Sequence, residues 1–511
     1  MNPNAIEKIV ILGGGTAGWM TAAALAHLLD AKRVSITLVE SEAVGTVGVG
    51  EATIPPILLF NQMLGIDEKE FVSRTHATFK LGIEFVNWGG LGEAYIHPFG
   101  DFATDLESLP LHQHWLRAKS HGYERDLFDF SLMAQAAKRG KFMPPVRGNA
   151  RSALAGIHYA YQFDAGAYAA FLRDYAEARG VRRVEGFVGD VLLDGQTGHV
   201  TSLKLEDGQD IEGELFIDCS GFRGRLIEGA LETGYEDWHR YLPVDRAIAL
   251  PCEMAGPPVP YTRATAHEAG WQWRIPLQHR TGNGHVYCSA FTSDEAALDR
   301  LSGSLDGGPI AEPKPLRFTT GHRRKFWNKN VVALGLAAGF MEPLESTSIH
   351  LVQTGIARLI SLFPDRRFSR VGIDAYNART LFEYERVRDF LVLHYTATKR
   401  DDTPFWRHCQ NLPQPDSLRE KVEQFEASGR VFREANELFT VSSWLSVMLG
   451  QGIQPTGWTP LVERFEVDDM SKRLEQVADV VDRAANAMPT HADYIAENCA
   501  SPLAPVRVVA E

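Results

Sequence analysis

Four apolar runs along the chain each end in glycines or in an acidic residue. The first covers Ile9 to Leu12 and is followed by Gly13; the second, "VSITLVE", ends at Glu40. The other two lie in "ELFIDCSGFRG" and "NVVALGLAAGF". Short apolar runs bounded by small residues are typical of strands that are buried on both faces. The pattern predicts an α/β fold with a mixed sheet, in which one domain is interrupted by long insertions.

Helical spacing of apolar residues dominates the last third of the chain. Both "LFEYERVRDFLVLHY" and "MSKRLEQVADVVDRAANAM" repeat apolar residues every three or four positions. They predict a mainly helical second domain, which we expect to bind the substrate. In the middle of the chain, "GWQWRIPL" places Trp271 and Trp273 two residues apart, so both would lie on one face of a strand. By itself, that arrangement is typical of a sheet core.

The first strand leads into a dinucleotide-binding motif. Gly13, Gly15 and Gly18 form G-x-G-x-x-G between a strand and an alanine-rich helix, which suits a tight turn, close approach of a pyrophosphate and helix–strand packing. Glu40 ends the second strand, where a carboxylate can accept hydrogen bonds from a ribose. A second glycine-rich loop, "GTVGVGEATIP", follows without a crossover helix, and this favours FAD over NAD.

Composition excludes several classes of partner. The formal net charge of −13 disfavours nucleic acid and anionic membrane surfaces, and no apolar stretch is long enough for a membrane span. Five cysteines lie far apart, so we expect neither disulfides nor a zinc ribbon but a reducing cytoplasm. His112 and His114, in "HQH", are a weak metal signal, and we expect no metal. No H-E-x-x-H, G-x-S-x-G or P-loop motif is present.

The sequence resembles the flavin-dependent tryptophan halogenases. The resemblance rests on "GGGTAGWM", "GVGEATIP", "KLGIEFVNW", "IHPFG", "DCSGFRG", "WQWRIP", "PLEST" and "RDFLVLHYTATKRDDTPFW", which span nearly the whole chain. The W-x-W-x-I-P signature is specific, because general flavin monooxygenases lack it. The resemblance implies a two-component halogenase that uses FADH2 from a flavin reductase, O2, and chloride or bromide to make hypohalous acid, which halogenates an aromatic substrate.

The resemblance also implies a division of the chain and a set of flavin contacts. We expect FAD-binding parts at 1–90, 151–235 and 321–365, a pocket-wall insertion at 91–150, a sheet insertion at 236–320 and a helical substrate domain at 366–511. The expected flavin contacts are Gly13, Gly15, Thr16, Ala17, Gly18, Glu40, Gly50, Ala52, Val188, Gly335, Leu336 and Ile349.

Two residues match the family's catalytic pair. Lys80 corresponds to the lysine that holds the electrophilic halogen, and Glu345 to the acid that assists the electrophile or takes the ring proton. The pattern alone favours other interpretations. A lysine between two apolar residues is typical of a surface position, and an acid at a helix start stabilises the helix dipole.

Further positions match the family's halide and substrate sites. The halide contacts fall on Thr347 and Ser348, at the N-terminus of a helix that we expect to begin near Ser346, although the second position is commonly glycine in the family. His97 and Phe99 match residues of the pocket wall, with a structural corner as the alternative. Trp271 and Trp273 match the tryptophans that lie near the flavin in the family.

The free-tryptophan enzymes hold the substrate's amino and carboxylate groups with a tyrosine pair, a glutamate and a Phe-Trp pair. Here Ala427-Ser428 stands at the tyrosines, Glu434 at the glutamate and Leu438-Phe439 at Phe-Trp. The alternative for Glu434 is a position on a solvated helix face beside Arg433 and Glu437. We therefore expect indole or a larger indole-bearing molecule as substrate rather than tryptophan.

Two other functions stay open. An aromatic hydroxylase of related fold would form product without halide, and a flavin-binding protein without catalysis would form none. A homodimer is a further expectation.

Overall fold

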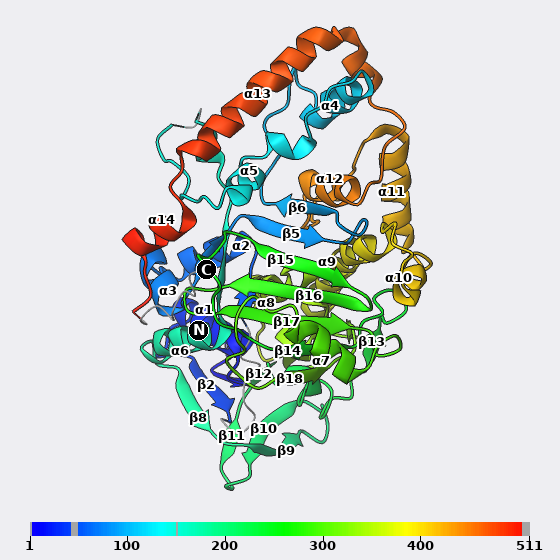
Figure 1. Ribbon diagram of the computed structural model, residues 1–511. Helices are drawn as coiled ribbons and strands as arrows, with labels where there is room; N and C mark the ends of the chain where they lie inside the picture. Colours follow the sequence, from blue (N-terminus) through cyan, green and yellow to red (C-terminus); the bar gives the residue numbers. More distant parts are fainter. Residues whose placement is uncertain (1–2, 42–49, 150–151, 503–511) are drawn as a thin grey trace. The chain divides into compact units, whose positions relative to one another are not determined.

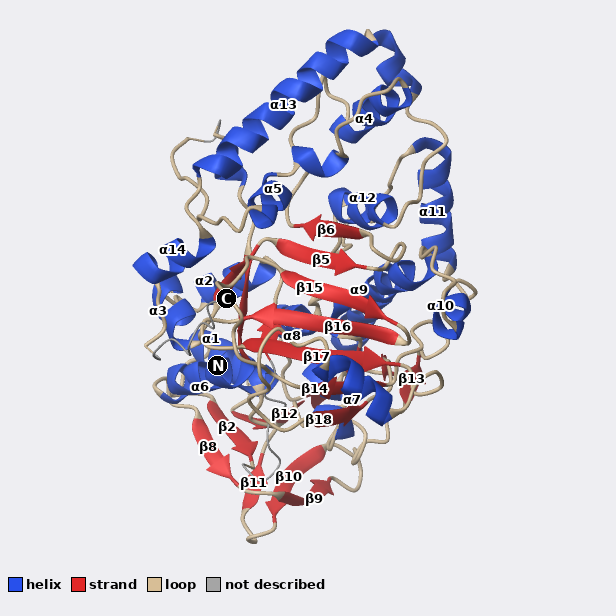
Figure 2. Cartoon of the chain, viewed as in Figure 1, coloured by secondary structure: helices blue, strands red, loops and turns tan. Residues whose placement is uncertain are grey.

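The computed structural model describes residues 3–41, 50–149 and 152–502 (Figures 1 and 2). The chain divides into two compact units, each built from three segments. Unit 1 comprises residues up to 76, 163–239 and 317–385, and unit 2 comprises 77–162, 240–316 and 386 onward.

The main sheet of unit 1 has six strands in the order β20-β21-β12-β1-β2-β8. All its pairs are parallel except β20–β21. Its central strands are almost entirely buried, as the continuous apolar runs predict. In chain order the strands are β1 (Lys8–Leu12), β2 (Ser35–Glu40), β8 (Arg182–Glu185), β12 (Leu215–Asp218), β20 (Trp327–Asn328) and β21 (Val331–Ala333).

Helices and two small antiparallel sheets complete unit 1. The helices are α1 (Thr16–Leu28), α2 (Pro56–Met63), α3 (Glu68–Arg74), α6 (Ala165–Glu177) and α8 (Ser348–Ser361). One small sheet contains β9 (Val188–Leu193), β10 (Val200–Leu205) and β11 (Asp210–Glu212); the other contains β13 (Tyr235–Asp237), β19 (Gly321–Arg323) and β22 (Gly339–Phe340). The short strand β3 (Gly50–Ala52) follows the second glycine-rich loop, of which residues 45–49 lie outside the described residues.

Unit 2 is built on a seven-stranded sheet in the order β18-β14-β17-β16-β15-β5-β6, drawn as the stack of long arrows in Figure 2. Most neighbours are antiparallel, whereas β15 and β5 run parallel. The strands are β5 (Gly82–Val86), β6 (Ala94–Pro98), β14 (Arg246–Ala249), β15 (Thr262–His267), β16 (Gly270–Pro276), β17 (Thr281–Tyr287) and β18 (Lys314–Arg317). A separate strand, β4 (Thr78–Lys80), pairs with β7 (Ala160–Asp164).

From Arg370 onward the α-helices and one 3-10 turn are the regular elements among the described residues. In α13 the apolar residues Met470, Leu474, Ala478, Val481 and Ala485 are buried at helical spacing, as the sequence predicts. The helices of this part are α9 (Arg370–Thr396), which belongs partly to unit 1, α10 (Pro404–Cys409), α11 (Asp416–Ser428), α12 (Val441–Gly450), α13 (Val467–Ala487) and α14 (His491–Asn498); earlier in unit 2 lie α4 (Leu111–Ser120), α5 (Leu132–Lys138) and α7 (Asp294–Ser302).

The mixed α/β fold predicted from the sequence is confirmed. The six-part division of the chain stays a prediction. Among the described residues, none of the helices combines the length and the apolarity needed to span a membrane.

Candidate active site

The glycine motif of unit 1 leaves space for a ligand at one of its three glycines. A Cβ atom on Gly13 would lie 2.2 Å from the backbone oxygen of Cys219, and one on Gly18 would lie 1.8 Å from the oxygen of Gly13. Both positions therefore require glycine for backbone packing. A Cβ on Gly15 would meet nothing within 4 Å, although this residue caps α1 and has ordinary extended backbone angles. The open space at the helix N-terminus fits the pyrophosphate of a dinucleotide.

Glu40 lies beside this turn. Its carboxylate forms an ion pair with Arg183 of β8, and a Cβ on Gly14 would clash with it. The carboxylate is therefore fixed at the carboxyl end of β2, next to the glycine turn. This arrangement fits a ribose hydroxyl, because a fixed carboxylate accepts hydrogen bonds.

The other expected flavin contacts of unit 1 lie on several segments. Gly335 has a left-handed backbone (φ 62°), and a Cβ there would lie 2.8 Å from Cβ of Ala17, so this glycine lets the 3-10 turn Gly335–Ala337 approach α1. Thr16 and Leu336 are half-buried. The remaining positions, Gly50, Ala52, Val188 and Ile349, are buried. Between two of them, burial raises the pKa of Glu51 to about 7.

The segment that carries Glu345 and the halide positions bends sharply before α8. Glu345 is 1% exposed and ends the 3-10 turn Pro343–Glu345, and Ser346 then adopts a left-handed conformation (φ 56°). Helix α8 begins at Ser348, with Thr347 as its N-cap, rather than near Ser346 as expected. Glu345 is therefore not in the first turn of α8, and the alternative of a simple helix-dipole charge is wrong.

The first turn of α8 has no side-chain cap. Thr347 is 1% exposed, its hydroxyl does not cap the helix, and Ser348 is half-buried. Backbone amides at an uncapped helix N-terminus are suited to an anion. The local chemistry fits a halide, and the substitution of the family's glycine by Ser348 keeps the backbone amide.

A buried charged network anchors α8 to α9, and the sequence analysis missed it. The carboxylate of Glu383 accepts hydrogen bonds from Thr354 (2.8 Å) and pairs with His350 (2.9 Å) and Arg358. Burial alone would raise the pKa of Glu383, but His350 and Arg358 outweigh it and lower the pKa to about 2. The spacing of His350, Thr354 and Arg358 on one helix face is the signal that could have revealed it.

Lys80 is a buried lysine of unit 2. It ends β4 and is 0% exposed, so the surface alternative is wrong. Its ammonium nitrogen lies 5.3 Å from the centre of the Phe99 ring, and Phe99 is itself buried. The structure thus brings together two residues that the sequence analysis assigned to the site.

His97 lies on β6, the edge strand of the seven-stranded sheet, among aromatic rings. It is 4% exposed, and its ring centre lies 5.7 Å from Phe390 and 6.4 Å from Phe439. Phe390 and Phe439 stack at 3.7 Å. His97 therefore belongs to an aromatic cluster that the sequence did not predict, and Phe439, which was matched to the Phe-Trp pair, is part of it.

Trp271 and Trp273 are both buried and lie 6.3 Å apart on one face of β16. Gly284, opposite on β17, makes room for the Trp273 ring, because a Cβ there would lie 2.0 Å from it. The ring centres of Trp271 and Trp88 lie 6.4 Å apart, and those of Trp88 and Trp406 lie 5.6 Å apart. The sheet-core interpretation is therefore correct within unit 2.

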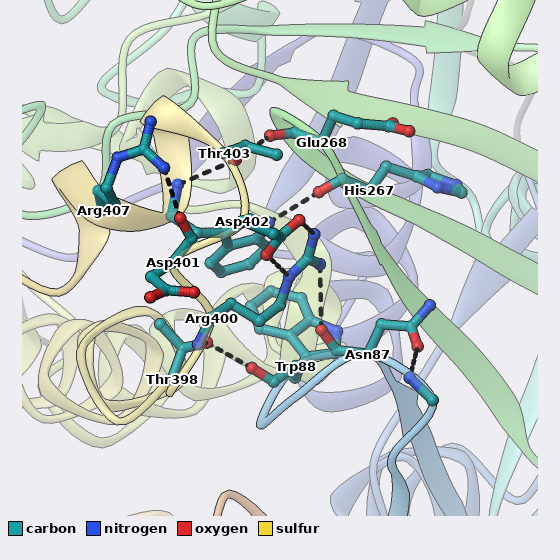
Figure 3. A network of polar contacts seen from close by, with 12 residues as sticks. Asn87, Trp88, His267, Glu268, Thr398, Arg400, Asp401, Asp402, Thr403 and Arg407 are labelled. Carbon is teal, nitrogen blue, oxygen red and sulfur yellow. Dashed lines mark hydrogen bonds and ion pairs between the residues drawn. The ribbon is translucent and has the colours of Figure 1, made fainter.

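Polar contacts hold this tryptophan cluster in place (Figure 3). Arg400 is 4% exposed and forms a two-pronged ion pair with Asp402 (2.8 Å for each contact) while it donates to the backbone of Asn87 (3.1 Å). The indole of Trp406 donates to the backbone of His267 (2.8 Å). The "RDDTPFW" motif thus connects the loop after β5 to the end of β15.

The region where the amino-acid group of tryptophan would bind is partly solvent-exposed. Ala427 is exposed at the end of α11, and Glu434 lies in the irregular segment before α12, not on a helix. The Glu434 side chain is 55% exposed and pairs with Arg386 at 3.2 Å. Glu437, by contrast, is buried and pairs with Lys421 (3.0 Å), so it is not part of a solvated face.

His112 and His114 point to different partners. The ring of His112 bonds to the backbone oxygen of Gly429 (3.0 Å), and that of His114 bonds to the oxygen of Leu106 (3.0 Å). The two rings therefore connect α4 to two different segments, one at Gly429 and one at Leu106.

A sequence model of the family described as tryptophan halogenase matches residues 8–467. The chain is 36% identical to the tryptophan 6-halogenase ThaL of Streptomyces albogriseolus, over 89% of this chain and 91% of that protein. Two solved structures are more similar. The flavin-dependent halogenase Xcc4156 from Xanthomonas campestris has a TM-score of 0.94 at 47% identity, with 98% of this chain and 100% of that chain covered. BrvH, a flavin-dependent halogenase from Brevundimonas sp. BAL3, has a TM-score of 0.94 at 43% identity, with the same coverage.

Flavin-dependent halogenases are oxidoreductases that use FADH2, O2 and a halide, and they work with a flavin reductase. The glycine turn, the open space at Gly15 and the fixed Glu40 carboxylate fit this cofactor. The family model covers most of the chain, and the identities extend over nearly all of it. The chain therefore belongs to the tryptophan halogenase family and is a flavin-dependent halogenase.

Proposed function

We propose that this enzyme halogenates an electron-rich aromatic that lacks the amino-acid group, such as indole or an indole derivative, rather than free tryptophan. The observation that carries this proposal is the ion pair of Glu434 with Arg386. Glu434 is the residue that would accept the amine of tryptophan, but its carboxylate is already engaged by a cation.

The tyrosine pair that would hold the carboxylate of tryptophan is also missing from this chain. Ala427 and Ser428 replace the tyrosine pair; the alanine offers no hydrogen-bonding side chain, and the Ser428 hydroxyl donates to the backbone of Gln424 (3.1 Å). A charged group that leaves water without matched donors costs several kcal/mol. Indole carries no such charge and avoids this cost.

The aromatic part of a substrate, in contrast, has suitable surroundings. His97, Phe390 and Phe439 form a buried cluster of rings. Aromatic rings favour stacked or edge-to-face contacts with other rings. An uncharged indole gains such contacts without needing an ionic partner.

We assign roles to the chain's residues as follows. When bound, the reduced flavin supplies the electrons that activate O2. The amides at Thr347 and Ser348 hold the halide, Lys80 holds the electrophilic halogen through its ammonium, and Glu345 accepts the proton that leaves the ring. A loosely held ring reacts where it is most nucleophilic, so we propose substitution at C3 of the pyrrole ring.

The exchange of Glu434 for glutamine tests the substrate proposal. Because Glu434 is engaged by Arg386, the KM for tryptophan should change less than about twofold. Arg386→Gln frees the Glu434 carboxylate and also removes the Arg386–Asp389 ion pair (3.2 Å), so it should lower the KM for tryptophan relative to that for indole. A large rise in the tryptophan KM of Glu434→Gln, with indole unaffected, would show that Glu434 binds the amine and would contradict the proposal.

Two further points of the proposal concern the whole protein. We propose a cytoplasmic enzyme that acts as a homodimer. Light scattering of the purified protein measures the mass in solution, and cell fractionation measures the location; a monomer or a secreted protein would contradict them.

A further inference from the structure

The strand that carries Lys80 lies at the edge of its sheet, and among the described residues no further strand pairs with that edge. On one side, β4 pairs with β7, with Thr78 opposite Gln162 and Lys80 opposite Ala160. The amide of Phe79 donates instead to the ring nitrogen Nε2 of His491, at 3.0 Å. The amide of Leu81 donates to the backbone oxygen of Pro260, at 2.8 Å. The two amides that flank Lys80 are therefore held by groups outside the strand pair.

The hydrogen bonds of His491 fix its protonation state. Its Nδ1 lies 2.7 Å from the backbone oxygen of Pro258, which can only accept, so Nδ1 carries the proton. Its Nε2 lies beside the amide of Phe79, which can only donate, so Nε2 is bare. The imidazole is thus a neutral bridge between β4 and the proline-rich segment 257–260. His491 is 1% exposed, and burial lowers its pKa to about 4.

The helix that carries His491 is firmly attached to the same region. The backbone amide of His491 donates to Gly140 (2.8 Å). One turn later, Tyr494 packs edge-on against Phe79 (5.4 Å) and Phe142 (5.2 Å), which stack on each other at 4.0 Å. Because side chains alternate along a strand, this packing holds Phe79 on one face of β4 and directs Lys80 to the other.

We propose that His491 is a positioning residue for Lys80, and that it acts by accepting the hydrogen bond from the Phe79 amide. The inference rests on the proposed role of Lys80 in halogenation. It assigns a role to the C-terminal helix α14, which contributes none of the residues in the proposed site. Misplacement of a reacting group by about 1 Å can cost on the order of 100-fold in rate, so the backbone next to Lys80 requires such support.

A pair of conservative variants separates the two hydrogen bonds. The side-chain amide of glutamine reaches the position of the His491 Nε2 atom, so its oxygen can accept from the Phe79 amide. The amide of asparagine reaches only the position of Nδ1, so it can donate to the Pro258 oxygen but cannot bond to Phe79. His491→Gln should therefore keep kcat for halogenation within about threefold of the wild type. His491→Asn should lower kcat by about tenfold or more, with little change in KM and with unchanged FAD binding.

Tyr494→Leu is the control for a merely structural role of α14. It weakens the packing on Phe79 but leaves the amide bond in place, so it should lower the melting temperature without a matching loss of kcat. Equal losses of kcat in His491→Gln and His491→Asn would overturn the proposal. So would equal losses of folded protein in these two variants, or a tenfold loss of kcat in Tyr494→Leu.

Crystal structures of the two His491 variants provide a readout that does not depend on halogenation. In His491→Gln the Lys80 ammonium should stay over the Phe99 ring, as in the wild type, where the distance is 5.3 Å. In His491→Asn it should be displaced. If Lys80 is displaced in His491→Asn but the wild type forms no halogenated product, the proposed function is refuted and the positioning role is supported. If Lys80 is not displaced in His491→Asn, the positioning role itself is refuted.

Discussion

The buried ammonium of Lys80 beside the Phe99 ring gives the first prediction at the residue scale. Lys80→Met keeps most of the side-chain volume and removes the charge. Halogenation should fall by at least about 1000-fold, because the halogen loses its hydrogen-bond donor, while FAD binding and the melting temperature should be nearly unchanged. Product is measured by mass spectrometry and FAD binding by fluorescence. Wild-type rates in this variant would rule out the role of Lys80.

Glu345 gives a second prediction at this scale. Glu345→Gln keeps the shape of the side chain but removes the proton acceptor. We expect kcat to fall by about 100-fold with less than threefold change in KM, since the lost interaction belongs to the transition state. Steady-state kinetics with saturating halide measure both constants. An unchanged kcat would show that another group takes the proton.

The role of a single residue could be predicted where the residue belongs to a motif. Its burial and its contacts could not, because they depend on tertiary packing. The neighbours Phe79 and Leu81 indicate an outward lysine, but β4 is buried on both faces, so Lys80 is enclosed. A helix face was the alternative considered for Glu434, but the chain there is irregular. His491 lies in no motif, and His350 is marked only by its helical spacing with Thr354 and Arg358. Their partners lie far away in sequence, and only the fold brings them together.

At the scale of elements, the β1–α1 connection makes the sharpest prediction. Gly15→Val should eliminate FAD binding, because the new side chain enters the open space at the helix N-terminus. The backbone angles of Gly15 suit valine, so the melting temperature of the apoprotein should stay within about 2 °C of the wild type. Gly18→Val is the matched contrast, since its Cβ would clash with Gly13 and the variant should fail to fold. FAD binding by folded Gly15→Val would refute the assignment.

Elements with a strong period could be predicted from the sequence, whereas short ones could not. The strands before Gly13 and Cys219 and the long helices α9 and α13 follow their apolar patterns. The start of α8 was misplaced by two residues, because the left-handed Ser346 interrupts the chain at a position where serine gives no warning. The pairing of β5 with β15 joins segments far apart in sequence, and no local pattern encodes it.

For the whole molecule, three buried histidines of unit 2 set a pH dependence of stability. Burial lowers the pKa of His112, His285 and His491 to about 4 in each case. The unfolded chain binds their protons near pH 6.5, so stability should fall as the pH decreases from about 6.5 to 4, by up to about 1.4 kcal/mol per pH unit for each histidine. Thermal melts between pH 7.5 and 5 measure this slope. The pKa of Glu51, raised to about 7, acts in the opposite direction over part of this range. His285→Asn should reduce the slope, and an unchanged slope in this variant would contradict the assignment.

The family of the whole chain was predictable because its motifs are spread over both units. The contacts of the residues at the family's amino-acid-binding positions could not be predicted, since the partner of Glu434 is Arg386, which lies in a different segment. That ion pair leads to the central claim about the substrate.

The most direct test is a competition between indole and tryptophan in one vessel, with purified enzyme, FAD, a flavin reductase, NADH and bromide. We expect indole to be consumed with the higher kcat/KM, because Ala427 and Ser428 supply no free donor that matches the carboxylate of tryptophan. The product should carry the halogen at C3, and no product should form without halide. Preferential conversion of tryptophan at one carbon of its benzo ring would contradict the account.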